Sequence, residues 1–334
     1  MVASIQHPSR HVWDFWYYFD RPTGLFHLFY LNADRALVAA GQHHYAACVG
    51  HATTADFGTI DWGDNTSYDV LKPPAHHWAN TCIWSGDIIS VANGWLMFYT
   101  SRDRNQDDGL TQAIGVAYTS NLFTHQWHFF DTQIKPGSVY QSRGLTDDLT
   151  MHAWRDPFLF RQRDRGQIFM LVAAKTVDSP LGKSGAIALL RVADHHFAQV
   201  VQGKRAWDYL TPLVAPGCYA EMEVPQLYQA AGDYELVFSC WAKYDFASAN
   251  DRGTGGGGFQ AVTLPPLGAG DAARPLPPPA KVLLPETQGL YACRIVPELD
   301  GEIVGFDIQT GGIRRSGIQI PWTAMDRDFS DLAV

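Results

Sequence analysis

One pattern of apolar and polar residues is repeated five times along this chain. Each copy has an aromatic or acidic start, a short apolar stretch, a turn and then a strongly apolar stretch. Successive copies begin 71, 70, 69 and 68 residues apart, at Trp13, Trp84, Trp154, Glu223 and Tyr291. Internal repeats at a fixed period are typical of solenoids, propellers and arrays. The pattern therefore predicts one structural unit, built five times, that occupies nearly all of the 334 residues.

The apolar stretches of each copy are short, rich in β-branched and aromatic residues, and separated by turn residues, which is typical of strands and hairpins. The second copy has a turn at 92–94 and predicts four strands, over residues 83–91, 95–100, 114–119 and 127–130. Four strands in each of five copies predict an all-β fold, a five-bladed β-propeller forming a single domain over residues 1–334. Residues 247–279 are rich in glycine and proline, so only a strand around 259–264 is expected there.

The composition narrows the possible partners. A formal net charge of −9 argues against nucleic acid and against an anionic membrane surface, because both bind basic faces. No stretch approaches the length of a membrane span, and the first residues lack the apolar segment of a signal peptide, so the protein is expected to stay in the cytoplasm. The five cysteines are scattered and are expected to be buried free thiols. The composition does not indicate the oligomeric state.

Carboxylates stand at the start of three of the five copies. In a propeller the innermost strand of each blade lines the central channel, so residues at corresponding positions are expected to converge on one axis. Asp14, Asp156 and Glu223 are therefore expected to be neighbours. Glu221 is expected on the same strand face as Glu223, because alternate residues of a strand point the same way. Converging carboxylates either bind a hard cation or divide the acid, base and nucleophile roles of glycoside cleavage.

Several short motifs resemble those of enzymes that process fructosides. The segment from His11 to Trp16 is similar to the Val-Trp-Asp-Ser-Trp start of levansucrases, which form glycoside hydrolase family 68. Further motifs occur in the same order along the chain as in these enzymes. They are Gly50-His51-Ala52-Thr53, Trp84-Ser85-Gly86, Trp154-Arg155-Asp156-Pro157 with its Arg-Asp-Pro motif, Glu221-Met222-Glu223 and Glu223-Val224-Pro225-Gln226-Leu227-Tyr228. Together they resemble the clan that joins family 68 with the invertases and inulinases of family 32.

The resemblance implies a retaining reaction on a β-fructofuranosyl unit such as that of sucrose. It assigns Asp14 as the nucleophile, Glu223 as the general acid and then base, and Asp156 as the stabiliser of the transition state. Retention requires the nucleophile and the acid to lie only about 5 to 5.5 Å apart, and the pKa of the acid to be raised. Glu221 is expected to raise that pKa, because a nearby like charge disfavours ionisation.

The same resemblance implies which side chains bind the substrate. Trp13 and Trp84 would wall the fructose, and Arg155 would pair with a carboxylate or a sugar hydroxyl through its planar fork. The other predicted contacts are Ser85, Glu221 and Tyr291. The predicted partner is a small carbohydrate, and no cofactor or metal ligand is predicted. His51 is expected to be structural, and the paired histidines lack a second set of metal ligands.

The chain departs from the levansucrase pattern at several positions. Phe15 stands where levansucrases have serine, Asp87 where small residues are usual, and Val224 where they have arginine. Levansucrases supply a basic residue to the leaving-group side from the strand that follows the Glu-Ile-Glu motif. In this chain that region reads Ser239-Cys240-Trp241, and the nearest basic residue after it is Lys243. The fructose site is therefore predicted to follow the family, and the glucose site is not. Short loops around the pocket favour hydrolysis of small substrates over polymer synthesis.

Two alternatives stay open on the sequence. One is an inverting hydrolase of pentosides related to glycoside hydrolase family 43, which shares the five-bladed fold and an Asp, Asp, Glu set. Its acid and base would be separated by more than about 6.5 Å, to leave room for a water molecule. The other is a carbohydrate-binding propeller without catalytic activity. Retention of all three carboxylates, Asp14, Asp156 and Glu223, argues against the second alternative.

Overall fold

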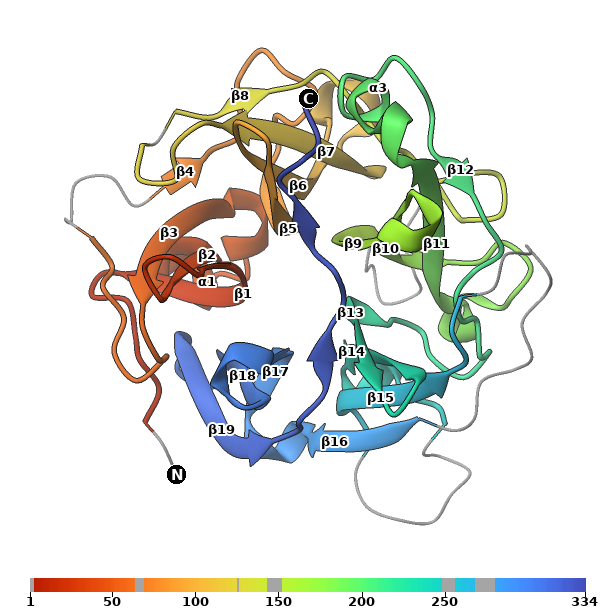
Figure 1. Cartoon of the computed structure of the whole chain (residues 1–334). Helices are drawn as coiled ribbons and strands as arrows, with labels where there is room; N and C mark the ends of the chain where they lie inside the picture. The colour runs from red at the N-terminus through yellow and green to blue at the C-terminus, as the bar shows by residue number, and fades with distance from the viewer. Residues whose placement is uncertain (1–2, 64–68, 125, 143–151, 248–255, 268–279) are drawn as a thin grey trace.

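Five antiparallel sheets form a ring around a central axis in the computed structural model, as Figure 1 shows. The structure describes residues 3–63, 69–124, 126–142, 152–247, 256–267 and 280–334. Each sheet is one blade, and the strands of each repeat follow one another in chain order from the axis outward. The prediction of a five-bladed β-propeller is confirmed.

The strands of each blade correspond to one copy of the sequence pattern. Blade one contains β1 (Arg10–Asp20), β2 (Leu25–Asp34), β3 (Cys48–Thr54) and β4 (Asp69–Leu71). Blade two contains β5 (Ile83–Val91), β6 (Gly94–Arg102), β7 (Gln112–Thr119) and β8 (His128–Phe129). Blade three contains β9 (Trp154–Gln162), β10 (Gln167–Lys175), β11 (Gly185–Ala193) and β12 (Asp208–Tyr209). The four strands predicted for the second copy are all present.

The last two blades complete the ring. Blade four contains β13 (Glu223–Ala230), β14 (Asp233–Cys240), β15 (Gly258–Leu264) and β16 (Lys281–Pro285). Blade five contains β17 (Leu290–Val296), β18 (Glu302–Asp307) and β19 (Ile313–Gln319). A β-bridge from the N-terminal segment, between Ile5 and Ile313, extends blade five at its outer edge and ties the beginning of the chain to its last repeat. The strand predicted around 259–264 is β15, whereas 248–255 and 268–279 lie outside the described residues.

Helices are short and occur only in the connections. The α-helices are α1 (Arg35–Ala39), α2 (Arg104–Asp107) and α3 (Phe197–Val201). The 3-10 helices are η1 (His43–Ala46), η2 (Arg163–Arg165), η3 (Leu181–Lys183), η4 (Asp194–His196), η5 (Ala242–Tyr244), η6 (Glu286–Gln288) and η7 (Pro297–Leu299). No helix in the described part of the chain is long and apolar enough to cross a membrane.

The blades are held together by apolar side chains between neighbouring sheets. Between blades two and three, for example, Ile89 and Phe98 belong to one buried cluster with Leu159 and Met170. All five cysteines are free, but Cys48 and Cys218 are only half-buried, so the prediction of buried thiols is right for the other three. Packing between the faces of twisted sheets leaves the inner strand ends free to form a site.

Each inner strand carries a break in its pairing close to its first residues. The register of β1 shifts between Val12 and Phe15, and corresponding shifts occur near the start of β5, β9, β13 and β17. Such β-bulges bend a strand and re-aim its side chains, and they are common next to active sites. Three non-glycine residues at these breaks have positive φ angles, namely Asp156 at 59°, Val224 at 51° and Ala292 at 45°.

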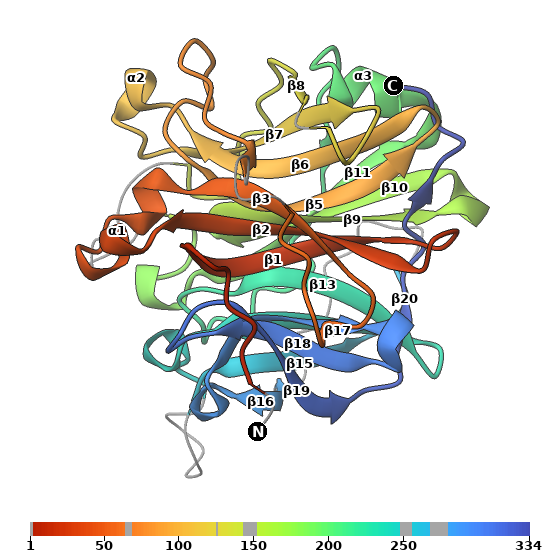
Figure 2. The ribbon, with the colours of Figure 1, turned by 90° about the vertical axis from the view of Figure 1, so that its left-hand side faces the viewer.

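The C-terminal strap, residues 321–334, crosses the centre of the ring from blade five (Figure 1). Its strand β20 (Thr323–Ala324) pairs with the far end of β13, at Tyr228 and Gln229. Its strand β21 (Asp328–Phe329) pairs in parallel with the far end of β5, at Ser90 and Val91. In Figure 2 the strap runs along one face of the ring, while α1 and α2 lie at the other face. The strap thus covers the end of the channel where the inner strands finish.

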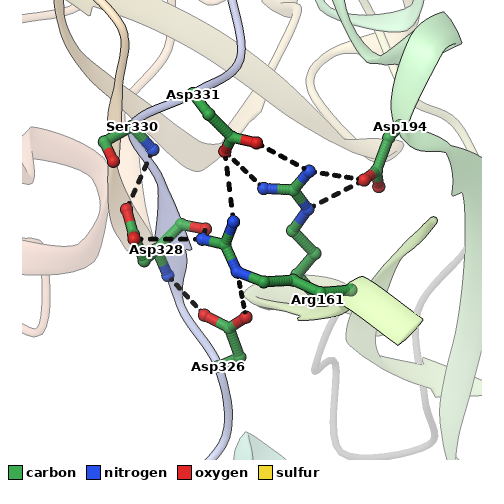
Figure 3. Close-up of polar contacts among 7 residues, drawn as sticks. Arg161, Asp194, Asp326, Asp328, Ser330 and Asp331 are labelled. Atoms are coloured by element: carbon green, nitrogen blue, oxygen red, sulfur yellow. Dashed lines mark hydrogen bonds and ion pairs between the residues drawn. The ribbon is translucent and has the colours of Figure 1, made fainter. Parts of the chain in front are cut away.

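Ion pairs fasten the strap to blade three. Arg161, on β9, bonds Asp194 at 2.5 Å and Asp331 at 2.5 Å, and Figure 3 shows its guanidinium between the two carboxylates. Arg163 reaches Asp326 at 2.7 Å from the same blade. Phe329 of the strap is fully buried in the cluster between blades two and three. The strap is therefore held by both apolar packing and charge.

Candidate active site

A cavity of about 660 Å³ opens at the end of the channel where the inner strands begin. Eight of the nine predicted site residues line it: Trp13, Asp14, Trp84, Ser85, Arg155, Asp156, Glu223 and Tyr291. All five blades contribute to this set, because Tyr291 starts the inner strand of blade five. The structure therefore brings together residues that lie more than 200 positions apart in the chain.

Asp14 lies in the bulge of β1 and faces the cavity. Ser85, from the bulge of β5, donates a hydrogen bond of 2.5 Å to its Oδ2. Burial raises the pKa of Asp14 to about 6, the Ser85 hydrogen bond opposes that rise, and the charge of Glu223 adds to it. Asp14 is therefore a carboxylate with few donors around it, ionised at neutral pH but close to its titration.

Asp156 is held by two hydrogen bonds, one from its own N–H and one to its carboxylate. Its N–H donates to Thr100 Oγ1 at 3.0 Å, and its Oδ2 accepts from the N–H of Val224 at 3.0 Å. Its positive φ is tolerable because Asp and Asn visit the left-handed region more readily than other side chains. Burial raises its pKa to about 7, Arg155 opposes the rise, and Asp14 and Glu223 reinforce it. The carboxylate is thus fixed in place and electrostatically destabilised.

Glu223 stands between a hydroxyl donor and a guanidinium. Its Oε2 accepts a hydrogen bond from the hydroxyl of Tyr291, and its Oε1 accepts from Arg155 Nη2 at 2.8 Å. The same Nη2 donates to Glu221 Oε2 at 2.9 Å, so the cation lies between the two glutamates. The predicted effect of Glu221 on the pKa of Glu223 stays a prediction. What the geometry adds is that Glu221 orients Arg155.

Glu221 itself does not line the cavity, unlike the prediction that it contacts substrate. It is buried behind Arg155 and forms a second ion pair, with Lys175 Nζ at 3.0 Å from its Oε1. Lys175 ends β10, is fully buried, and also donates to the carbonyl of Ala220 at 2.5 Å. A buried carboxylate needs such partners because an unpaired charge is very costly in the interior. The chain Lys175, Glu221, Arg155 and Glu223 therefore positions the last carboxylate.

The sequence pattern gave no signal for Lys175, because its apolar neighbours on β10 resemble an ordinary core strand. It also assigned no site role to a group of residues in loops at the cavity mouth. These are His44 and Tyr45 on η1, Tyr244 on η5, and Trp241 and Lys243, which were noted only where the chain departs from levansucrases. The rings of Trp241 and Tyr291 are stacked at 3.9 Å. Lys243, which the sequence places just beyond the position where levansucrases have a basic residue, lines the cavity.

The three carboxylates do not occupy corresponding positions in their blades, contrary to the simplest form of the repeat prediction. By strand pairing, Glu223 corresponds to Arg155 and Tyr291, because each is the last paired residue before the register shift. Asp156 follows that paired position by one residue, and Asp14 comes from the end of its own bulge. The bulges therefore bring side chains from staggered register positions into one cavity.

Two of the departures from the levansucrase pattern lie away from the cavity. Phe15 is buried in an apolar cluster, with its ring 5.8 Å from that of Phe57. Asp87 is buried deeper in the channel, where it accepts from the N–H of Leu159 at 2.8 Å and pairs with Arg327 of the strap. Val224 lines the cavity, as do Trp241 and Lys243 of the fourth departure. The first two changes therefore do not bear on the glucose side, contrary to expectation.

His51 is not among the residues that line the cavity, in keeping with the expectation that it is structural. Its Nε2 is 3.0 Å from Nδ1 of His27, and both rings belong to blade one. Across the described residues, no group of three or more His, Cys, Asp or Glu side chains is arranged to hold a metal ion. The cavity instead offers two carboxylates at its centre, each with one hydroxyl donor, and a third fixed by the backbone. Carboxylates in this setting can act as nucleophile, acid and hydroxyl ligand toward a sugar.

Comparison with known proteins agrees with this chemistry. The family model described as Glycosyl hydrolases family 32 N-terminal domain matches residues 17–239. The match contains Asp156 and Glu223, and it begins just after Asp14. No curated protein matches the chain by sequence. Because the family model covers well over half of the chain, it establishes the family.

Solved structures with the same fold come from enzymes of two related families. The inulosucrase from Halalkalicoccus jeotgali bound to kestose is 17% identical, with a TM-score of 0.64 over 92% of this chain and 79% of the other. The β-fructofuranosidase catalytic domain from Microbacterium saccharophilum K-1 is 17% identical, with a TM-score of 0.64 over 94% of this chain and 78% of the other. The levansucrase from Gluconacetobacter diazotrophicus is 18% identical, with a TM-score of 0.60 over 92% of this chain and 77% of the other. The chain belongs to glycoside hydrolase family 32, within the clan of fructoside-processing enzymes.

Proposed function

We propose that this protein is a retaining β-fructofuranosidase that acts on sucrose or a similarly small fructoside. The observation that carries the proposal is the meeting of Asp14, Asp156 and Glu223 in one cavity, with Arg155 joining the last two. Asp14 attacks the anomeric carbon of fructose as the bond to the leaving oxygen breaks, and Glu223 gives its proton to that oxygen. Water then loses a proton to Glu223 and attacks the same carbon, which releases Asp14.

The surroundings of each carboxylate support these roles. Asp14 receives one side-chain hydrogen bond, from Ser85, so it keeps much of its basicity and nucleophilicity. The Tyr291 hydroxyl and Arg155 hold Glu223 in one orientation, from which it can donate and recover a proton. Asp156 accepts from the backbone with one oxygen, which leaves the other for fructose hydroxyls that bind more strongly as the ring flattens.

Water is the proposed acceptor of the fructosyl group. Trp13, Trp84 and the stacked pair Trp241 and Tyr291 line the cavity. The remaining lining at the mouth comes from short connections such as η1 and η5, which favour a small substrate over a growing polymer. High-molecular-weight fructan among the products of prolonged incubation with sucrose would contradict this part of the proposal.

The substrate is tested by incubation with sucrose, raffinose, short fructans and aryl arabinofuranosides, with the products separated and quantified. Fructose release is expected, and turnover of the arabinofuranosides alone would favour a pentoside hydrolase instead. Asp14→Asn and Glu223→Gln should each lower kcat/KM on sucrose by about four orders of magnitude or more, as loss of a nucleophile or a proton donor does elsewhere. Asp331→Asn, on the opposite face, is the matched control and should retain activity. Near-normal activity of either site variant would overturn the assignment.

A further inference from the structure

The helix η1 (His43–Ala46) forms part of the cavity mouth, although no motif of the sequence pointed to it. It lies in the connection between β2 and β3 of blade one, and two of its residues, His44 and Tyr45, line the cavity. Both are exposed to solvent, and the exposed fraction of Tyr45 is 59%. A large aromatic side chain that is this exposed at the rim of a sugar pocket has a face available to a ligand.

The positions of both side chains are fixed from behind. The main-chain oxygen of His44 accepts a hydrogen bond of 2.7 Å from the indole N–H of Trp84. The His44 ring meets the rings of Trp13 and Trp84 edge-on, with centroid distances of 5.8 and 6.4 Å. The guanidinium of Arg102 lies 5.1 Å from the Tyr45 ring and 4.7 Å from the Trp84 ring. The mouth is therefore organised before any ligand arrives, which reduces the entropy lost on binding.

The polar atoms of His44 are available to a ligand. Within the ranges that the structure describes, neither ring nitrogen of His44 has a hydrogen-bond partner, although the ring is surrounded by Trp13, His43 and Trp84. Although the residue reaches solvent, the packed rings around the imidazole desolvate it and lower its pKa to about 4, with His43 and Arg155 acting in the same direction and Glu223 opposing them. The ring is consequently neutral at neutral pH and offers one N–H donor and one acceptor nitrogen. Sugar hydroxyls can satisfy both.

The neighbourhood of Glu223 indicates which part of the substrate this side chain meets. His44 and Glu223 line the same cavity, His44 from the connection η1 and Glu223 from the start of β13. In the proposed reaction Glu223 protonates the oxygen of the departing group, so polar atoms beside it at the mouth face that group. The ammonium of Lys243, across blade four, lies 4.4 Å over the ring of Tyr244. The mouth thus combines a neutral imidazole with aromatic faces, a combination suited to an uncharged sugar ring.

We propose that His44 and Tyr45 hold the leaving group of the fructoside, His44 by hydrogen bonds to sugar hydroxyls and Tyr45 by packing against the sugar ring. This inference rests on the proposed function and names residues for the part of the site in which the chain departs from levansucrases. His44 is a specificity-determining residue in this account, because an uncharged sugar uses its contacts and an aryl leaving group does not.

The test compares sucrose with 4-nitrophenyl β-D-fructofuranoside, whose leaving group has no hydroxyls. His44→Phe keeps a ring of similar packing and the backbone carbonyl bonded to Trp84, but removes both ring nitrogens. It should lower kcat/KM on sucrose about tenfold, the effect of losing a good hydrogen bond. It should change kcat/KM on the nitrophenyl substrate by less than about twofold. His44→Gln should recover part of the activity on sucrose, since an amide can again donate and accept.

Gln42→Ala is the matched control, because this exposed residue precedes η1 and its side chain makes no capping hydrogen bond. It should leave both substrates unaffected. Equal losses on the two substrates, or no loss on either, would overturn the inference while the proposed function stands. A wild-type enzyme that cleaves the nitrophenyl substrate but no sugar-linked fructoside would overturn it as well. A wild-type protein that cleaves neither substrate would instead refute the proposed function.

Discussion

The two ends of the propeller channel both concentrate aspartates, but the electrostatics of the two groups are opposite. At the cavity, burial raises the pKa of Asp14 to about 6 and that of Asp156 to about 7. At the strap, hydrogen bonds from Ser330 and Arg161 lower the pKa values of Asp328 and Asp331, respectively. Folding therefore works against ionised carboxylates at the cavity and favours them at the strap. Only the second group contributes to stability at neutral pH.

The difference follows first from burial, which dominates at the cavity, and then from the hydrogen-bond donors that each carboxylate receives. Asp14 has one side-chain donor, Ser85, in a buried setting. Asp331 is largely open to water and bonds the guanidinium of Arg161. A carboxylate that is left short of donors is unfavourable for the folded state but reactive toward a substrate. The buried carboxylates of the cavity thus lower the stability of the folded state at neutral pH. The ion pairs and apolar packing of the strap are among the contacts that offset this cost.

Removing the charge of Asp156 should have opposite effects on activity and stability. Asp156→Asn keeps an acceptor for the Val224 N–H and suits the positive φ, because asparagine also tolerates that region. We expect kcat/KM on sucrose to fall about a thousandfold, as for the loss of a group that stabilises a transition state. We also expect a gain in the free energy of unfolding at pH 7 of up to about 4 kcal/mol, since the pKa rises from 3.8 to about 7 and each pKa unit corresponds to about 1.4 kcal/mol.

The gain should depend on pH in a defined direction. Because folding raises the pKa of Asp156, its contribution to stability is complete below its ordinary value of 3.8 and is lost as the pH rises toward about 7. The amide does not titrate, so the melting temperature of the variant should overtake that of the wild type progressively between about pH 4 and pH 7. Thermal melts across this range measure the difference. A constant difference would mean that burial does not strain this carboxylate.

A change in the strap should do the reverse. Phe329 is fully buried between blades two and three, so Phe329→Ala should lower the free energy of unfolding by about 3 to 5 kcal/mol. Its kcat/KM on sucrose, measured well below the melting temperature, should stay within about twofold of the wild type. Denaturant titration and initial rates check the two halves of this expectation. A large loss of activity in the folded variant would show that the strap and the cavity are coupled.

The smallest change in the free energy of unfolding is expected from the exposed ion pairs that hold the strap. Arg163 is partly exposed and pairs with Asp326 and Asp328 at the surface. Arg163→Ala should therefore lower the free energy of unfolding by at most about 1 kcal/mol, and less at high salt. Arg161→Ala is the matched comparison, because its guanidinium is buried against Asp194 and should matter more. Equal losses for the two variants would mean that burial does not distinguish these ion pairs.

Much of the ring could be predicted from the sequence because each repeat carries its own local signals. The strand predicted over residues 83–91 is β5 itself, and the period placed Trp13, Trp84 and Tyr291 around one axis. The offset between Asp14, Asp156 and Glu223 could not be predicted, since it depends on where each inner strand bulges. A bulge is a feature of pairing between strands and leaves little trace in the pattern of a single strand.

The ion pairs and loop residues that support the site could not be predicted from the sequence, for a different reason. Lys175 resembles the end of a core strand, and only the fold brings it to Glu221. Asp87 looked like a change at the sugar site, but its partner Arg327 lies 240 positions away in the strap. The residues of η1, including His44, belong to a connection without regular spacing. Long-range pairs and irregular loops carry no periodic signal from which a sequence argument could begin.

The central claim, that Asp14 is the nucleophile of a retaining reaction, is tested most directly by trapping its covalent intermediate. In Glu223→Ala, an aryl β-fructofuranoside can still react, because its leaving group needs no proton, whereas hydrolysis of the intermediate is slowed. Peptide mass spectrometry of the rapidly quenched variant should find a fructosyl group on the peptide that contains Asp14. Adding Asp14→Asn should abolish it. Release of nitrophenol without any adduct, or an adduct on another residue, would contradict the account.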